Sequence, residues 1–102
     1  MADEAKLSLS DLAEGAMKTV ELGGEEVVVA NVGGRCYAFG GICTHDGAPL
    51  IDGELDGDRL ICPWHFTEFD VKTGEVVDGV ADEALPVYEV EIDGDEVRVL
   101  KR

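Results

Sequence analysis

The sequence predicts an all-β, antiparallel fold, and three observations support this prediction. Short apolar stretches recur along the 102 residues and are separated by Gly and Asp. Several stretches alternate apolar and polar residues, which is the period of a strand with one buried face. Paired glycines, Gly23-Gly24 and Gly33-Gly34, stand between stretches, where tight hairpin turns require positive φ. Strands at short, regular spacing favour a sandwich or a small barrel.

The elements follow in order along the chain. Residues 10–15 combine a capping residue, acidic first-turn positions and a final Gly, and they predict one short helical turn. In the stretch that ends before the turn at Gly94, alternation places Tyr88, Val90 and Ile92 on the buried face. The predicted strands are 16–22, 26–32, 35–39, 59–62, 68–71, 87–92 and 96–100.

Size and charge limit the organisation and the partners. The hydrophobic fraction is 45% and the charged fraction 30%, as in ordinary globular proteins, and 102 residues supply one modest core. We therefore expect residues 1–102 to form a single domain. The formal net charge is -15, which disfavours nucleic acid and anionic membrane surfaces as partners. The acidity either suits docking to a basic partner or only keeps the protein soluble.

The start of the chain and its cysteine count bear on location. Met1-Ala2-Asp3-Glu4 lacks the basic start and apolar stretch of a secretory signal. The aliphatic run 27–30 is far shorter than the roughly 20 residues of a membrane helix. We therefore expect a cytoplasmic, unanchored chain. Three cysteines, an odd number, argue against a disulfide framework and for metal binding or unmodified thiols.

Two segments depart from the strand pattern and carry the chemistry. One contains Cys43 and His45, the other contains Cys62 and His65, and the chain has no further histidine. Together they offer two thiolates and two imidazoles, which bind zinc or an iron–sulfur cluster. In a structural zinc finger the two cysteines usually share one knuckle and the two histidines one helix. Here each loop is mixed, which suits two irons, with the thiolates on one and the imidazoles on the other.

The pattern Cys43-x-His45 followed by Cys62-x2-His65, with Pro63 inside the second box, resembles the Rieske family. In that family two His replace two Cys on one iron of a [2Fe-2S] cluster. The resemblance implies one [2Fe-2S] cluster held by these two Cys and two His residues. It also implies an antiparallel Rieske-like β-sandwich, with a cluster-binding subdomain formed by two hairpin loops.

The flanking segments 47–50, 69–74 and 85–88 also look like those of the family, so the resemblance covers most of the chain. We accordingly expect one Rieske domain over the whole chain. Its cluster-binding part is expected at about 40–70.

Residues around the two boxes indicate the kind of Rieske protein. Respiratory-chain members carry an extra Cys in each loop, joined as a disulfide, where this chain has Ala48 and Trp64. They also place a Ser and a Tyr that donate hydrogen bonds after the second box, where this chain has Thr67 and Phe69. Of these two residues only Thr67 is able to donate. We therefore expect a reduction potential in the lower part of the Rieske range, roughly -150 mV to about zero.

Three further residues have two interpretations each. Cys36 lies in a predicted strand and is interpreted as a small buried hydrophobe rather than a ligand. Phe66 stands where relatives often have Gly, and it either shields the outer iron or forms part of a docking surface. Trp64 either covers the cluster or contacts a partner, and its large apolar area favours the cover.

The implied function is that of a one-electron carrier rather than an enzyme, since no nucleophile is paired with a base and no nucleotide-binding fingerprint is present. The chain resembles the ferredoxin component of aromatic-ring dioxygenases. Its implied partners are a flavin-dependent reductase and a terminal oxygenase or other acceptor protein. Two alternatives stay open, a Rieske-like small subunit of an NAD(P)H-dependent nitrite reductase and a zinc-stabilised interaction domain.

Overall fold

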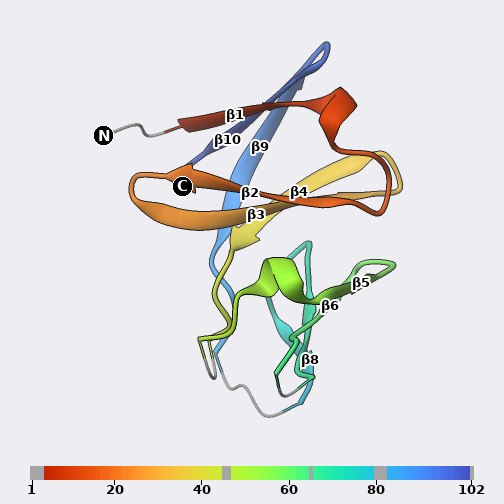
Figure 1. The fold of residues 1–102 in the computed structure, drawn as a ribbon, viewed down its shortest axis with the longest axis vertical. Coiled ribbons are helices and arrows are strands. Elements are labelled where there is room, and N and C mark those ends of the chain that lie inside the picture. Colours follow the sequence, from red (N-terminus) through yellow and green to blue (C-terminus); the bar gives the residue numbers. More distant parts are fainter. Residues whose placement is uncertain (1–3, 45–46, 65, 80–82, 102) are drawn as a thin grey trace.

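The computed structural model describes residues 4–44, 47–64, 66–79 and 83–101, and these form antiparallel sheets joined by short loops (Figure 1). Among these residues no helix has the length and apolar character needed to cross a membrane. The strands are β1 (Glu4–Ser8), β2 (Met17–Leu22), β3 (Glu25–Val32), β4 (Arg35–Gly40), β5 (Glu54–Asp56), β6 (Arg59–Ile61), β7 (Glu68–Asp70), β8 (Val76–Asp78), β9 (Val87–Asp93) and β10 (Glu96–Leu100).

The strands form one six-stranded and one four-stranded sheet. The larger sheet has the order β1-β10-β9-β4-β3-β2, and the smaller has the order β5-β6-β7-β8. Although β1 and β2 stand at opposite ends of the first order, they pack against each other, so the larger sheet folds round on itself. The smaller sheet and the loops that precede and follow it form the lower part of the molecule in Figure 1. The predicted all-β, antiparallel fold is confirmed.

Strand β3 is buried on both faces, and this explains its uninterrupted apolar run. Val27 and Val29 face a core inside the larger sheet, which also contains residues of β4 and β10. Val28 and Ala30 face a second core, shared with the smaller sheet and its loops. The second core consists of Val28, Ala30, Phe39, Cys43, Ala48, Leu50, Leu60, Cys62, Phe69, Val71 and Leu85. The larger sheet therefore supports the loops through side chains of β3 and β4.

The predicted strands all occur, with ends that agree to within one residue. Strands β1, β5 and β8 are not among those predicted, and two of them are only three residues long, too short to show a period. The predicted helical turn is a shorter 3-10 helix, η1 (Leu9–Asp11), and a second one, η2 (Leu50–Asp52), was not expected.

The predicted burial of Ile92 is wrong, since its side chain is 46% exposed. Strand β9 pairs with β4 only at Val87 and Tyr88, so its outer half has β10 as its single neighbour. Ile92 lies on this overhanging half, one pair from the hairpin turn. Tyr88 lies nearer the centre, where its hydroxyl donates to Oε2 of Glu25 at 3.0 Å. Partial burial and this bond raise the pKa of Tyr88.

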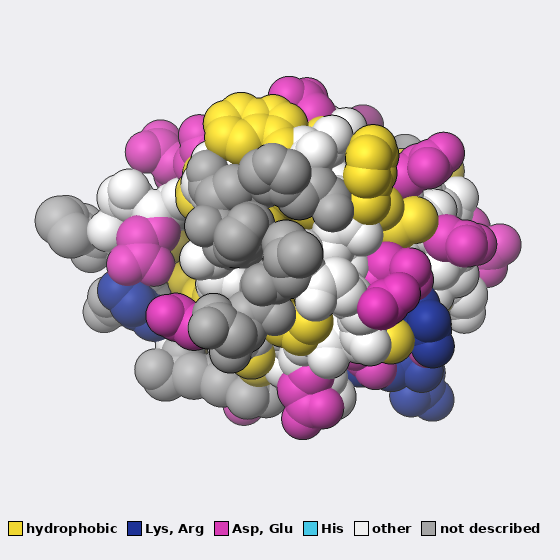
Figure 2. Space-filling view, turned by 90° about the horizontal axis from the view of Figure 1, so that it is seen from below, with side chains coloured by type: hydrophobic (Ala, Val, Ile, Leu, Met, Phe, Trp, Pro, Cys, Tyr) yellow, Lys and Arg dark blue, Asp and Glu magenta, His cyan; other side chains and the backbone are white. Residues whose placement is uncertain are grey.

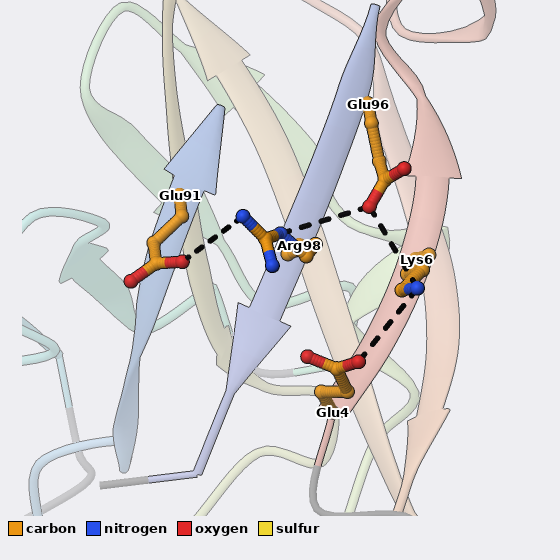
Figure 3. A network of polar contacts seen from close by, with 5 residues as sticks. All are labelled: Glu4, Lys6, Glu91, Glu96 and Arg98. Atoms are coloured by element: carbon orange, nitrogen blue, oxygen red, sulfur yellow. Dashed lines mark ion pairs between the residues drawn. The ribbon is translucent and has the colours of Figure 1, made fainter. Parts of the chain in front are cut away.

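A chain of ion pairs crosses the outer strands of the larger sheet (Figure 3). Arg98 lies between Glu91 and Glu96, with N···O distances of 3.5 and 3.6 Å. Lys6 lies between Glu96 and Glu4, at 3.8 and 3.7 Å. These side chains are 35–55% exposed, so solvent screens each pair and it is worth no more than about 1 kcal/mol. The network partly offsets the repulsion among carboxylates at this end of an acidic molecule.

We predict that Gly74→Ala lowers the free energy of unfolding by roughly 2–4 kcal/mol, because it adds an overpacking cost to a left-handed backbone cost. Gly74 has a φ of +78°, and a Cβ there would overlap the carbonyl oxygen of Leu85. Gly24→Ala is the matched control, since its φ is +85° but nothing lies within 4 Å of the added Cβ. We expect about 1 kcal/mol for this control, from the backbone alone. Urea denaturation measures both, and equal losses would contradict the prediction.

Candidate metal centre

The first cysteine segment closes on itself through backbone hydrogen bonds. The N–H of Cys43 donates to the carbonyl of Ala48 at 2.9 Å, and the N–H of Gly47 donates to the carbonyl of Cys43 at 3.0 Å. Gly47 has a φ of +76°, which lets the backbone turn back toward Cys43. Cys43 is only 2% exposed. The predicted ligand His45 lies outside the described residues.

The second cysteine segment has the same hydrogen-bond pattern. The N–H of Cys62 donates to the carbonyl of Thr67 at 2.8 Å, and the N–H of Phe66 donates to the carbonyl of Cys62 at 3.1 Å. Phe66, at the position that corresponds to the glycine of the first segment, has a φ of +61°. Cys62 is fully buried. The fourth predicted ligand, His65, also lies outside the described residues.

The same turn occurs a third time, after β7, without a cysteine. The N–H of Asp70 donates to the carbonyl of Glu75 at 2.8 Å, and the N–H of Gly74 donates to the carbonyl of Asp70 at 2.7 Å. We refer to 43–48, 62–67 and 70–75 as the three closed turns. In each, the fifth residue has a positive φ. The chain therefore adopts the same turn conformation three times, and two of the three turns begin with Cys.

The structure brings Cys43 and Cys62 into one buried cluster and leaves Cys36 in the other. The two former residues belong to the core shared by both sheets, whereas Cys36 packs inside the larger sheet. None of the three forms a disulfide. Burial raises the pKa of the Cys36 thiol, which keeps it protonated and unreactive. The interpretation of Cys36 as a small core residue is confirmed.

Within the described residues, no group of three or more His, Cys, Asp or Glu side chains is arranged to hold a metal ion. Both histidines lie outside those residues, so the geometry bears on the thiols alone. Two cysteines that begin matching turns and share one core are a suitable half of a site for a soft metal cluster. The ligand set Cys43, His45, Cys62 and His65 stays a prediction.

Thr67 supplies a second observation at the same place. Its side chain is fully buried, and no described residue accepts or donates a hydrogen bond at its Oγ1. Leaving a buried hydroxyl without a partner costs about 1–3 kcal/mol. Gly79 packs closely here, since a Cβ on it would lie 2.9 Å from this oxygen. A buried donor that lacks a partner among the described residues, in the turn that begins at Cys62, fits a sulfur-rich group bound between the turns.

At the end of the molecule that carries the cysteine turns, the surface shows apolar patches with acidic side chains around these patches (Figure 2). Trp64 and Phe66 are 55% and 70% exposed, and Ile42 is 46% exposed. Trp64 is thus a surface residue, which favours the contact interpretation over the cover. No Lys or Arg occurs in the sequence between Arg35 and Arg59, a stretch that includes the first cysteine turn.

We predict that Phe66→Gly raises the free energy of unfolding by about 0.5–1 kcal/mol. The left-handed backbone costs Phe about 1–2 kcal/mol, and the greater chain entropy of Gly offsets part of that gain. Little packing is lost, because the ring is mostly exposed. Phe66→Ala is the control, since it removes the ring and keeps the backbone cost. Thermal or urea unfolding compares the three proteins, and a gain with Ala as large as with Gly would refute the explanation.

Comparisons with known proteins bear directly on this site. A sequence model of a family described as the Rieske [2Fe-2S] domain matches residues 5–89. The chain is 36% identical over 87 residues to the ferredoxin component of the naphthalene 1,2-dioxygenase system of Pseudomonas putida, covering 85% of this chain and 84% of that protein. It is also 36% identical over 97 residues to apoptosis-inducing factor 3 of Homo sapiens. That match covers 95% of this chain but only 16% of the human protein's length.

Solved structures agree with the sequence comparisons. The fold superposes with a TM-score of 0.92 on a chain from a complex of reduced oxygenase and oxidized ferredoxin in carbazole 1,9a-dioxygenase. The two chains are 35% identical, and the match covers 98% of this chain and 94% of the other. The likeness therefore includes both sheets and the turns between them.

Proposed function

Because the chain belongs to the Rieske [2Fe-2S] domain family, we propose that Cys43, His45, Cys62 and His65 hold one [2Fe-2S] cluster. The observation that carries this proposal is that each of the two cysteines begins a closed turn and that both side chains pack in the same core. We further propose that residues 1–102 form a single Rieske domain. Its cluster-binding part is placed at about 40–70.

Once bound, the cluster supplies one-electron transfer. Among the proposed ligands, the thiolates of Cys43 and Cys62 would each add one negative charge, whereas neutral imidazoles would add none. A site with two thiolates is therefore less negative than one with four, which makes uptake of an electron easier. The closed turns fix both cysteines, and the apolar core behind them excludes water from that side. Thr67 provides a buried hydroxyl that is available to the cluster.

The role of the chain is to carry electrons, as do ferredoxin components that match it along most of their own length. We propose that it takes electrons from a flavin-dependent reductase and passes them to a terminal oxygenase. Support comes from the naphthalene and biphenyl dioxygenase ferredoxins and from the carbazole 1,9a-dioxygenase complex. We place it in the cytoplasm, where the absence of a disulfide among its three cysteines is expected.

A second candidate is a module of a larger oxidoreductase. The match to apoptosis-inducing factor 3 covers nearly all of this chain and a small part of that protein, so a similar domain occurs within a much longer chain. A Rieske-like subunit of an NAD(P)H-dependent nitrite reductase belongs to the same class. Purification of the native protein from its source distinguishes the two, because a carrier is isolated alone and a subunit with its enzyme.

We predict that the dithionite-reduced protein gives a rhombic EPR signal with the low average g-value of a mixed His/Cys cluster. Cys43→Ala and Cys62→Ala should abolish the signal and the visible absorption, since each removes a thiolate ligand. Cys36→Ala is the matched control and should retain both, because its side chain lies in the other core. A colourless wild-type protein containing zinc would instead establish the zinc-stabilised domain.

We predict that Thr67→Val lowers the reduction potential by about 40 mV, the equivalent of about 1 kcal/mol for one electron. If the hydroxyl donates to the bound cluster, which would become more negative on reduction, its removal would destabilise the reduced state. Thr44→Val is the control, because the Thr44 hydroxyl already donates to the carbonyl of Glu83 at 2.7 Å. Redox titration followed by EPR measures both potentials. A shift with Thr44→Val equal to that with Thr67→Val would argue against a specific donor.

A further inference from the structure

Phe66 occupies a position that the other two closed turns give to glycine. The fifth residues of those turns are Gly47 and Gly74, with φ of +76° and +78°. Phe66 has a φ of +61°, and it is the only non-glycine residue with positive φ in the described part of the chain. Its ring is 70% exposed, so burial does not repay the backbone cost. The stability of the chain therefore does not account for an aromatic ring at this position.

The ring stands at an open hollow of about 380 Å³ on the surface. The lining is more apolar than polar and includes Cys62, so the hollow adjoins the second cysteine turn. Asp52 and Glu54 contribute two exposed carboxylates to the same hollow. Neither forms an ion pair with a Lys or Arg of the described residues. The residues lining the hollow are Asp52, Gly53, Glu54, Ile61, Cys62, Pro63 and Phe66.

This combination matches the chemistry of a basic side chain. The methylene groups of Arg or Lys pack on apolar surface while their charged ends reach polar groups. A cation beside an aromatic face gains further attraction, and carboxylates supply charge-assisted hydrogen bonds. The net charge of -15 favours a basic partner over an acidic one.

We propose that the hollow bounded by Phe66, Asp52 and Glu54 receives a basic side chain from the docking face of the protein that exchanges electrons with this chain. This inference rests on the proposed function, because it identifies where the carrier's partner binds. Docking here brings the partner against the turn that holds Cys62, so the path between the two redox centres is short. The exposed Trp64, two residues from Phe66 in the sequence, offers a second apolar contact on the same segment.

The test measures electron transfer from the dithionite-reduced protein to ferric cytochrome c, a basic haem protein, by stopped-flow at low ionic strength. The double variant Asp52→Asn/Glu54→Gln removes the carboxylates. The matched control, Asp11→Asn/Asp93→Asn, makes the same change in net charge at η1 and the β9–β10 hairpin, at the opposite end of the molecule (Figure 1). Phe66→Gly removes the ring and keeps the turn.

We expect the hollow variant to lower the second-order rate constant about tenfold, an effect that added salt diminishes. The control pair should change it by less than about twofold, since exposed charges far from the contact are screened. Phe66→Gly should lower it roughly threefold through loss of the cation–aromatic contact. Equal effects of the two charge pairs, or a full rate with Phe66→Gly, would overturn the inference.

The cluster's visible absorption is recorded for every variant, so that the two proposals are separated. A wild-type protein that shows the absorption but does not reduce cytochrome c would overturn the docking inference and leave the proposed cluster intact. A wild-type protein without iron would overturn the proposed function, and with it the docking inference.

Discussion

Burial of β3 on both faces is the constraint on which the rest of the structure depends. Val27 and Val29 fill the core within the larger sheet, while Val28 and Ala30 form one wall of the second core. The second core contains both cysteines that begin closed turns, so the position of each thiol is set by packing against a sheet strand rather than by loop contacts alone. Rigid sheet elements thus hold two loops that have little regular structure of their own.

Much of this arrangement was predictable because it depends on period and spacing. Short apolar stretches, several of them alternating with polar residues, located seven strands. Gly23-Gly24 and Gly33-Gly34 located two hairpins, since glycine readily takes both left-handed positions of such turns. The mixed Cys and His pairs indicated the chemistry, because a structural zinc finger usually keeps its two cysteines apart from its two histidines, whereas here each loop carries one of each. Strand β5 was not predictable, since three residues show no period.

Features that depend on backbone hydrogen bonds or on neighbours in space could not be predicted from the sequence. The three closed turns share a pattern of backbone hydrogen bonds, whereas their sequences share little beyond a glycine at the fifth position of two of them. The sequence showed that Phe66 stands where relatives often have glycine, but it did not reveal that the backbone of Phe66 is left-handed. The exposure of Ile92 depends on how far β4 extends beside β9, which no local pattern reveals. The positions of His45 and His65 lie outside the described residues.

The closed turns have a consequence for how a metal centre is assembled. Two backbone hydrogen bonds close each turn, so the backbone itself helps to fix the positions of Cys43 and Cys62. A cluster that binds these two thiols would then carry less of the entropy cost of fixing the two cysteines. The third turn, which starts at Asp70, shows that the same geometry forms without any thiol. A metal centre of this kind would be assembled between turns that their own backbone bonds close, in contrast to small zinc domains, which fold around their ion.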